Sequence, residues 1–196
     1  QLLSGQMTGD YFPIELSAMQ AKLNFRSVDG PFEVGGMKIR PFRLPHPGGS
    51  LGYRVEAGNA VFILATDSEF DKIALNQEDL AKNHLARRQY SDELIEFMSG
   101  ANLIVIDTQY TDAVYQQRKG WGHNSIATVV DLCNQVQPDM VAMCHHDPQS
   151  TDHMVSNMSD DAARRLKRAG SDTLVFSARE GLTVKVHRPK PPPALS

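Results

Sequence analysis

Four side chains that can bind metal ions or transfer protons each follow a predicted β-strand directly. They are His46, Asp67, Asp107 and His145. Strand ends are where α/β folds place functional groups, because the strands are rigid and the loops beyond them can vary. Taken singly, His46 could be an ordinary loop histidine and Asp67 could cap the following turn. Together the four offer the nitrogen and oxygen donors that zinc, manganese and iron prefer, so they predict a metal or acid–base site.

The strands that must deliver these side chains are predicted from hydrophobic patterning and from the residues that end each run. Alternating or continuous apolar runs stop at Pro, Gly or Asn, and Gly58-Asn59 is typical of a tight hairpin turn. The predicted strands are residues 37–44, 51–56, 60–65, 103–106 and 140–144, followed by a last hairpin of 173–177 and 182–187.

Apolar residues at near-helical spacing predict helices between these strands. The predicted helices are residues 78–98, 126–136 and 152–169. The first could be two helices broken near Tyr90-Ser91. The second is capped by Asn124 or Ser125 and ends before Pro138.

The composition is that of an ordinary globular chain, with 196 residues of which 41% are hydrophobic and 22% are charged. Since 20 basic residues stand against 23 acidic ones, nucleic acid is not favoured as a partner. No apolar run approaches the roughly 18 residues needed to span a bilayer. Cys133 and Cys144 are expected to be reduced core thiols, which favours a cytoplasmic location. We expect one domain over residues 1–187 and an extended, proline-rich tail over residues 188–196.

Two further features receive structural interpretations. Basic pairs such as Arg87-Arg88 are expected to lie on solvated helix faces. Trp121 could stack on a nucleobase, but a core or loop-anchoring role is favoured because an indole offers so much apolar area.

The chain contains, in this order, the segments LPHPGGSLGYRVE, VFILATD, LIVIDTQYT, KGWGHNSIATVVDL and MVAMCHHDP. Together they resemble the downstream motifs of the metallo-β-lactamase superfamily, and most of all its phosphodiesterase and ribonuclease Z-like branch. The resemblance implies an α+β fold, the αββα sandwich, with residues 1–187 as the C-terminal part of one metallo-hydrolase domain. The family's first metal motif, His-x-His-x-Asp-His, does not occur in this sequence. An N-terminal half that carries it is expected as a partner, in the same polypeptide or as a separate chain.

Residue by residue, the resemblance implies a site for two divalent metal ions, with zinc expected and manganese or iron as alternatives. His46 resembles a ligand of the first metal, Asp67 the carboxylate that bridges both metals, and His145 a ligand of the second. His146 is the alternative to His145 as that ligand. Otherwise His146 and Asp147 are expected to support the ligands through hydrogen bonds.

The segment Gly122-His123-Asn124-Ser125 resembles an element that, in the phosphodiesterase branch, reaches the scissile phosphate from a helix start. His123 is implied to be catalytic and to be held protonated by the charge of Asp107. Asn124, which departs from the Gly-His-Ser/Thr pattern of the family, and Ser125 are implied to bind the substrate.

The activity that the resemblance implies is hydrolysis of a small phosphodiester, such as a cyclic nucleotide, by a hydroxide that two metal ions activate. One alternative is a carbon-ester or thioester hydrolase of the lactonase or glyoxalase type. The other is an inactive scaffold subunit that lacks the upstream motif. Without that motif the chain alone is expected to be inactive. A homodimer is compatible with the resemblance, and no membrane association is expected.

Overall fold

The computed structural model describes residues 5–7, 14 and 16–186. Its centre is a mixed sheet whose seven strands follow one another in sequence order. β1 to β4 form an antiparallel meander, and β4 to β7 run parallel to one another. The strands are β1 (Phe32–Val34), β2 (Met37–Leu44), β3 (Ser50–Ala57), β4 (Ala60–Ala65), β5 (Leu103–Asp107), β6 (Met140–Cys144) and β7 (Leu174–Ser177).

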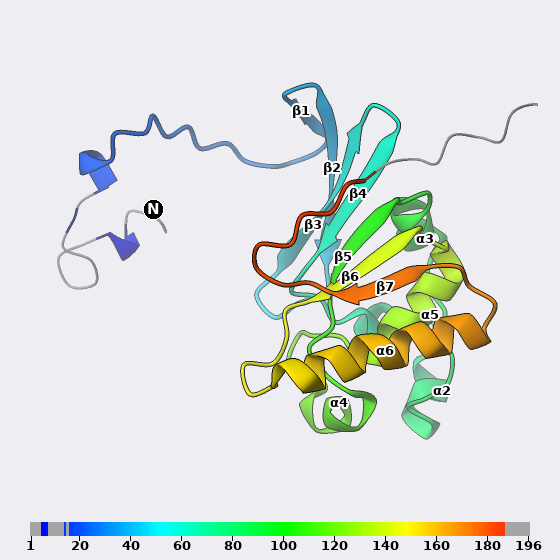
Figure 1. Cartoon of the computed structure of the whole chain (residues 1–196). Coiled ribbons are helices and arrows are strands. Elements are labelled where there is room, and N and C mark those ends of the chain that lie inside the picture. The colour runs from blue at the N-terminus through cyan, green and yellow to red at the C-terminus, as the bar shows by residue number, and fades with distance from the viewer. Residues whose placement is uncertain (1–4, 8–13, 15, 187–196) are drawn as a thin grey trace, which may run out of the picture.

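The helices connect the parallel strands, and Figure 1 shows α3, α5 and α6 gathered on one side of the sheet. The described helices are η1 (Leu16–Ala18), η2 (Phe70–Ile73), α2 (Gln77–Lys82), α3 (Asp92–Met98), α4 (Asp112–Arg118), α5 (Ile126–Val136) and α6 (Asp152–Arg168). In the described part of the chain, no helix is both long and apolar enough to cross a membrane.

The hydrophobic core lies between the sheet and these helices. Alternate strand residues such as Ile63, Ile104 and Val141 are buried against helix residues such as Leu132 and Leu166. Side chains of successive strand residues point to opposite faces, so every second residue of β4, β5 and β6 belongs to this core. The core fixes these three strands relative to one another and thereby fixes the positions of their carboxyl ends.

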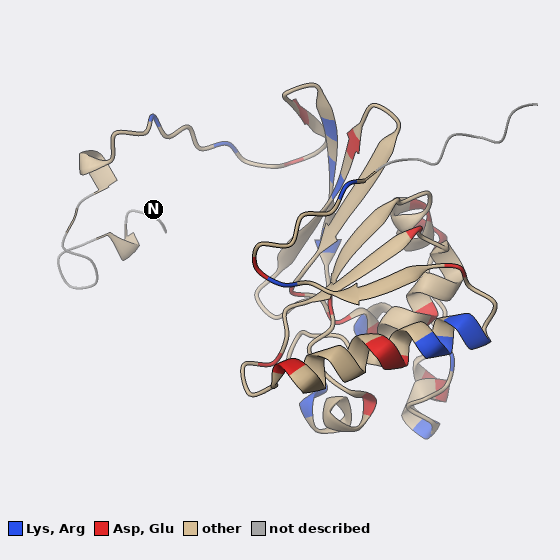
Figure 2. Cartoon of the chain, in the orientation of Figure 1, with Lys and Arg blue, Asp and Glu red and all other residues tan. Residues whose placement is uncertain are grey.

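Charged residues of both signs are interspersed along the described chain, as Figure 2 shows. Helix α6 begins with Asp152 and has Arg165, Lys167 and Arg168 in its last turn. This placement stabilises the helix because acidic groups interact favourably with a helix start and basic groups with its end.

Several predicted elements are confirmed at their predicted boundaries, namely β2, β4, α5 and β6. Ser125 caps α5 by accepting a hydrogen bond from the Thr128 N–H, and Gln137 ends it in the left-handed conformation, one residue before Pro138. Strand β3 is one residue longer at each end than predicted, and β5 includes Asp107. The two cysteines are free, as expected, but only Cys133 belongs to the core, and Cys144 is half-buried.

The helix predicted over residues 78–98 is two helices, and the break between them is longer than expected. Residues 83–91 are not helical, and Ser91 caps α3 by accepting a hydrogen bond from the Leu94 N–H. Four of the described elements were not predicted, namely β1, α4 and the short helices η1 and η2. Gly35-Gly36, where both φ angles are positive, is the turn signal that could have revealed the β1–β2 hairpin.

The predicted C-terminal hairpin is wrong. β7 pairs in parallel with β6, and residues 182–186 form no strand. The reason is that α6 returns the chain to the open edge of β6, which makes a strand–helix–strand crossover. Residue 187 and the predicted tail, 188–196, lie outside the described residues.

Arg88 corrects the expectation that the Arg87-Arg88 pair lies on a solvated helix face. Arg87 is exposed, but Arg88 is only 1% exposed. Its Nε and Nη2 donate to the two carboxylate oxygens of Asp71 at 2.8 and 2.9 Å, and its Nη1 donates to Asp131 at 3.2 Å. This buried cation therefore joins the segment before α3 to both η2 and α5.

Arg88→Leu is expected to lower the free energy of unfolding by about 3–5 kcal/mol, because it leaves buried carboxylates without their cation. The matched control is Arg87→Leu at the exposed neighbour, which should change that free energy by no more than about 0.5 kcal/mol. Urea unfolding followed by circular dichroism measures both. Equal losses in the two variants would contradict a structural role for the Arg88 ion pairs.

Candidate metal centre

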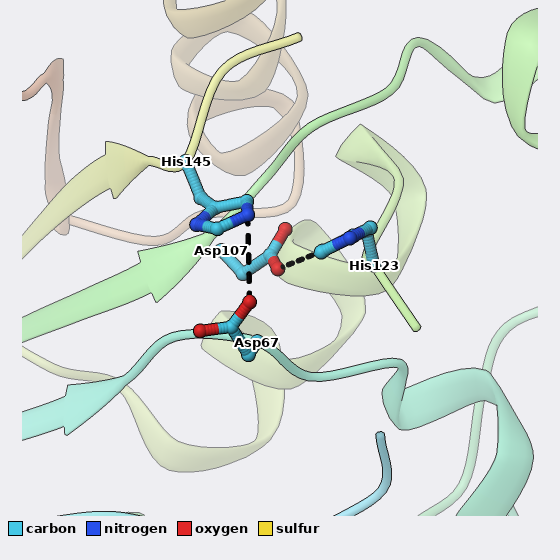
Figure 3. A group of neighbouring side chains, drawn as sticks. All are labelled: Asp67, Asp107, His123 and His145. Atoms are coloured by element: carbon cyan, nitrogen blue, oxygen red, sulfur yellow. Dashed lines mark hydrogen bonds and ion pairs between the residues drawn. The ribbon is translucent and has the colours of Figure 1, made fainter. Parts of the chain in front are cut away.

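Four of the predicted site residues converge at one edge of the sheet. Asp67 follows β4, Asp107 ends β5, His145 follows β6, and His123 comes from the loop before α5. Figure 3 shows the four side chains turned towards one another. One potential ligand atom from each lies within 4.8 Å of the others. The neighbouring positions of β4, β5 and β6 in the sheet bring these side chains together.

Asp67 and His145 have strained backbones. Their φ angles are 53° and 58°, in the left-handed region that residues other than glycine seldom adopt. Among the described non-glycine residues only Gln137, at the end of α5, shares this property. Directly after their strands the chain turns so that His145 Nε2 lies 3.4 Å from Asp67 Oδ1. Backbone strain of this kind persists at binding and catalytic sites, where the surroundings enforce it.

The Asp107 side chain is fully buried and has one free oxygen. Its Oδ2 lies 2.6 Å from His123 Nδ1 and accepts a hydrogen bond from the Ser68 N–H at 3.4 Å. Its Oδ1 is buried without a hydrogen-bond partner among the described residues. Burial raises the pKa of Asp107 to about 7, although the charge of His145 opposes this shift. A buried carboxylate oxygen without a hydrogen-bond donor lowers the stability of the fold unless a cation or a proton binds it. Oδ1 is therefore a candidate metal ligand.

The sequence predicted that the charge of Asp107 holds the His123 ring protonated, and the direction of the His123 pKa shift is opposite to this prediction. The pKa of His123 is lowered, first by burial and then by the charge of His46, while nearby carboxylates act in the opposite direction. Both members of the pair therefore disfavour their charged forms. We interpret the 2.6 Å contact as one proton shared between Asp107 and His123 near neutral pH.

His46 lies beside the four-residue cluster rather than within it. Its ring centroid is 5.3 Å from that of His123, and its Nδ1 is 3.0 Å from the carbonyl oxygen of Gly122. Because a carbonyl oxygen only accepts hydrogen bonds, Nδ1 carries the proton and Nε2 keeps its lone pair. This tautomer suits a histidine that binds a metal through Nε2. The metal-ligand role of His46 stays a prediction.

The two predicted substrate contacts, Asn124 and Ser125, are both fully buried. The Asn124 amide donates to the Ser68 hydroxyl at 2.9 Å and to the Asp107 carbonyl at 3.1 Å, and it accepts from a backbone N–H of η2 at 2.8 Å. The Ser125 hydroxyl caps α5. All polar atoms of the Asn124 side chain are therefore engaged. Asn124 holds the loop to the end of β5, and Ser125 holds it to the start of α5.

His146 and Asp147 were predicted to support the metal ligands. Within the described part of the chain, no hydrogen bond joins either side chain to Asp67 or His145. Both ring nitrogens of His146 are buried without a hydrogen-bond partner there. Burial lowers the pKa of His146, although the backbone of Ala178 opposes this shift. It is His145, rather than His146, that turns towards Asp67.

Glu69 is a site residue that the sequence patterns did not reveal. Its side chain is buried, and its carboxylate accepts hydrogen bonds from the N–H groups of Gly120 at 2.7 Å and Gly122 at 2.9 Å. The Tyr115 hydroxyl donates to it at 2.9 Å, and the Lys72 ammonium group lies 3.2 Å away. Glu69 therefore fixes the loop that leads to His123. Its position two residues after Asp67 is the one sequence feature that could have indicated a role in the site. A single Glu in a loop is usually solvated, so this feature is weak.

Gly122 has no room for a side chain. Its φ angle is 101°, and an added Cβ would overlap the His46 imidazole and lie 2.7 Å from Pro47 Cδ. Gly120 has a similar φ angle of 88°, but nothing lies within 4 Å of the position of its Cβ. Glycine at position 122 therefore allows the loop to pass close to the ring of His46.

Gly122→Ala is expected to displace His46 and to weaken metal binding about 10- to 100-fold, the usual loss when the support of a ligand is removed. Gly120→Ala is the matched control, because it carries the same positive-φ strain without the overlap with His46. Titration of zinc into both metal-free proteins measures the difference. If the two variants bind zinc equally well, the contact between Gly122 and His46 does not support the site.

The donors in the four-residue cluster fit a divalent metal ion. Two carboxylates and two imidazoles supply the oxygen and nitrogen ligands that such ions prefer. One of these oxygens, on Asp107, lacks a donor, and the strained backbones of Asp67 and His145 turn both side chains inward. The fold and the site thus define a class of protein in which candidate metal ligands lie at the ends of parallel strands, in a sheet with helices on one face.

Comparisons with solved structures identify this fold. The metallo-β-lactamase fold protein YhfI from Bacillus subtilis matches with a TM-score of 0.57 and 17% identity, over 80% of this chain and 53% of that one. The short form of human tRNase Z matches with a TM-score of 0.52 and 13% identity, over 80% of this chain and 46% of that one. No protein-family model matches the sequence, and no curated protein matches it.

The chain has the metallo-β-lactamase fold, which confirms the predicted fold class. It spans about half the length of these two solved structures. The described residues supply one sheet with helices on one face, which is the arrangement expected for one half of an αββα sandwich.

Proposed function

We propose that the protein is a metal-dependent hydrolase of small phosphodiesters and that it uses two divalent metal ions, with zinc expected. The observation that carries this proposal is the contact between His123 and Asp107, 2.6 Å long, directly beside Asp67 and His145. A metal site alone serves many hydrolases. A histidine–carboxylate pair next to it, in the loop before α5, supplies a proton for a leaving group and lies near a helix start that favours a phosphate.

In this proposal Asp67 and His145 bind metal ions, with His46 as a further ligand from the adjacent loop. Asp107 Oδ1 has no hydrogen-bond donor among the described residues, so it is available as an additional oxygen ligand. Bound divalent ions would supply an activated water and neutralise charge that develops on phosphoryl oxygens. The strained turns at Asp67 and His145 keep both side chains in place before a metal arrives.

His123 is the proposed proton donor. Its Nδ1 is occupied by Asp107, so Nε2 is the atom that can face the substrate. The raised pKa of Asp107 and the lowered pKa of His123 favour a neutral carboxyl group that donates to Nδ1 and a neutral ring whose own proton is on Nε2. A general acid is most effective when its pKa lies near the working pH, because it is then both protonated and able to release the proton. Asn124, Ser125 and Glu69 hold the loop that presents His123.

The test measures the rates at which the natural full-length protein hydrolyses substrates of two chemical classes, phosphodiesters and carbon esters. We expect hydrolysis of a cyclic nucleotide or of a bis-aryl phosphodiester that a chelator abolishes and added zinc or manganese restores. A lactone and a thioester should react far more slowly. Metal-dependent hydrolysis of the lactone or thioester alone would replace the proposal by carbon-ester chemistry. Metal binding without hydrolysis of any of these substrates would favour a scaffold role.

A further inference from the structure

Trp121 is the single tryptophan of the chain, and it is not in the core. The residue is 55% exposed, which corrects the core role, one of the two roles, core or loop-anchoring, that the sequence favoured. Exposing an indole forgoes a large burial energy, since aromatic side chains are among the largest apolar groups available. The guanidinium of Arg118, at the end of α4, lies 4.1 Å from the centroid of the ring. The exposed indole therefore has a cation against it.

The backbone on both sides of Trp121 is held rigidly. The N–H groups of Gly120 and Gly122 both donate to the buried carboxylate of Glu69, and the Trp121 N–H donates to the Arg118 carbonyl at 3.1 Å. An exposed aromatic ring on a fixed backbone loses little conformational entropy when a ligand stacks on it. The Trp121 side chain is thus exposed on a backbone that need not rearrange when a ligand stacks on the ring.

The same loop joins Trp121 to the candidate metal centre. Gly122, the next residue, lies against the ring of His46, and the one after it is His123. Tyr110 packs edge-on against His123 with ring centroids 6.0 Å apart.

We propose that Trp121, supported by Arg118, is a stacking platform for an aromatic group of the substrate, such as a nucleobase or an aryl ester. The proposal rests on the phosphodiesterase activity proposed above and narrows it to phosphodiesters that carry an aromatic group. Every nucleobase has a flat face that can stack on an indole, so the platform selects aromatic over alkyl substrates without selecting one base. The Arg118 guanidinium against the ring fixes its orientation and adds positive charge near an anionic substrate.

The kinetic test compares two phosphodiesters that differ only in their side group, a nucleoside ester and a methyl ester. Stacking on an aromatic side chain is worth about 1–3 kcal/mol per base, which corresponds to roughly a 5- to 150-fold change in affinity. We therefore expect Trp121→Ala to raise KM for the nucleoside ester by about 10- to 100-fold, with a much smaller change for the methyl ester. Trp121→Phe should restore most of the affinity. Leu174→Ala, at a residue 59% exposed on β7, is the control for loss of a surface apolar group.

A binding test needs no turnover. Adenosine monophosphate should quench the fluorescence of Trp121 in metal-free protein, and glycerol phosphate at the same concentration should not. Quenching without hydrolysis of any phosphodiester would keep the platform and overturn the proposed function. Equal changes in KM for both esters in Trp121→Ala, or hydrolysis of both without any quench, would overturn the platform and leave the phosphodiesterase proposal standing.

Discussion

Asp67→Asn is expected to remove bound metal and to reduce hydrolysis to the background of the metal-free protein. In the proposed site this carboxylate would hold the metal ions, and the amide that replaces it is a neutral, weaker ligand. The substitution is close to isosteric. Asn also tolerates the φ angle of 53° that Asp67 adopts, so the fold should be retained. Elemental analysis of reconstituted protein should find about two ions per polypeptide in the full-length wild type.

Two further variants make the Asp67→Asn result specific. His145→Asn keeps a residue that tolerates the φ angle of 58° at position 145 but removes the imidazole, and it should also lose metal. Asp172→Asn, an exposed residue outside the site, should retain metal and activity. A finding of full metal content and full activity in Asp67→Asn would reject the proposed metal centre. We expect the 196-residue chain without an upstream half to bind metal weakly, because it lacks the His-x-His-x-Asp-His motif.

His123→Ala should lower kcat on an alkyl phosphodiester by about 10²- to 10⁴-fold while metal content stays at the wild-type level. That range is typical for the loss of a general acid. The loss should be much smaller on a nitrophenyl phosphodiester, whose leaving group needs little protonation. Equal losses on the two substrates would indicate that His123 positions the phosphate instead of donating a proton.

His123 also belongs to the group of four side chains that could ligate a metal, so metal content must be measured on the same samples. If His123→Ala loses metal together with activity, as Asp67→Asn should, then His123 is a ligand and Asp107 orients it. His46→Ala provides a further comparison, because it should lose metal and activity together. Undiminished turnover of alkyl phosphodiesters by His123→Ala would remove this histidine from the mechanism.

Local sequence determined those elements whose boundaries depend on local chemistry. The strand β2 stops at Pro45, the turn at Gly58-Asn59 separates β3 from β4, and the Ser125 cap begins α5. In each case the residue that ends or starts the element acts on its own neighbours along the chain. Patterns of this kind predict boundaries well because no distant contact competes with them.

Distant contacts decided the features that the sequence patterns missed. Arg88 is buried because Asp71 and Asp131 lie around it, and Glu69 is buried because it binds two amides of a loop some 50 residues later. The pairing of β7 with β6 likewise depends on where α6 returns the chain. Charged residues are expected at the surface unless buried partners exist, and such partners cannot be read from neighbouring residues.

The amino-acid sequence by itself determined which donors this protein carries at the ends of its strands, namely the carboxylates of Asp67 and Asp107 and the imidazole of His145. Only the tertiary structure decided how they are arranged. The left-handed turns at Asp67 and His145 and the tether of His46 to Gly122 set the directions of these side chains, and burial raises the pKa of Asp107. The physical reason is that side-chain direction and pKa depend on packing and desolvation by residues far away in the chain, whereas residue type and strand position are local properties.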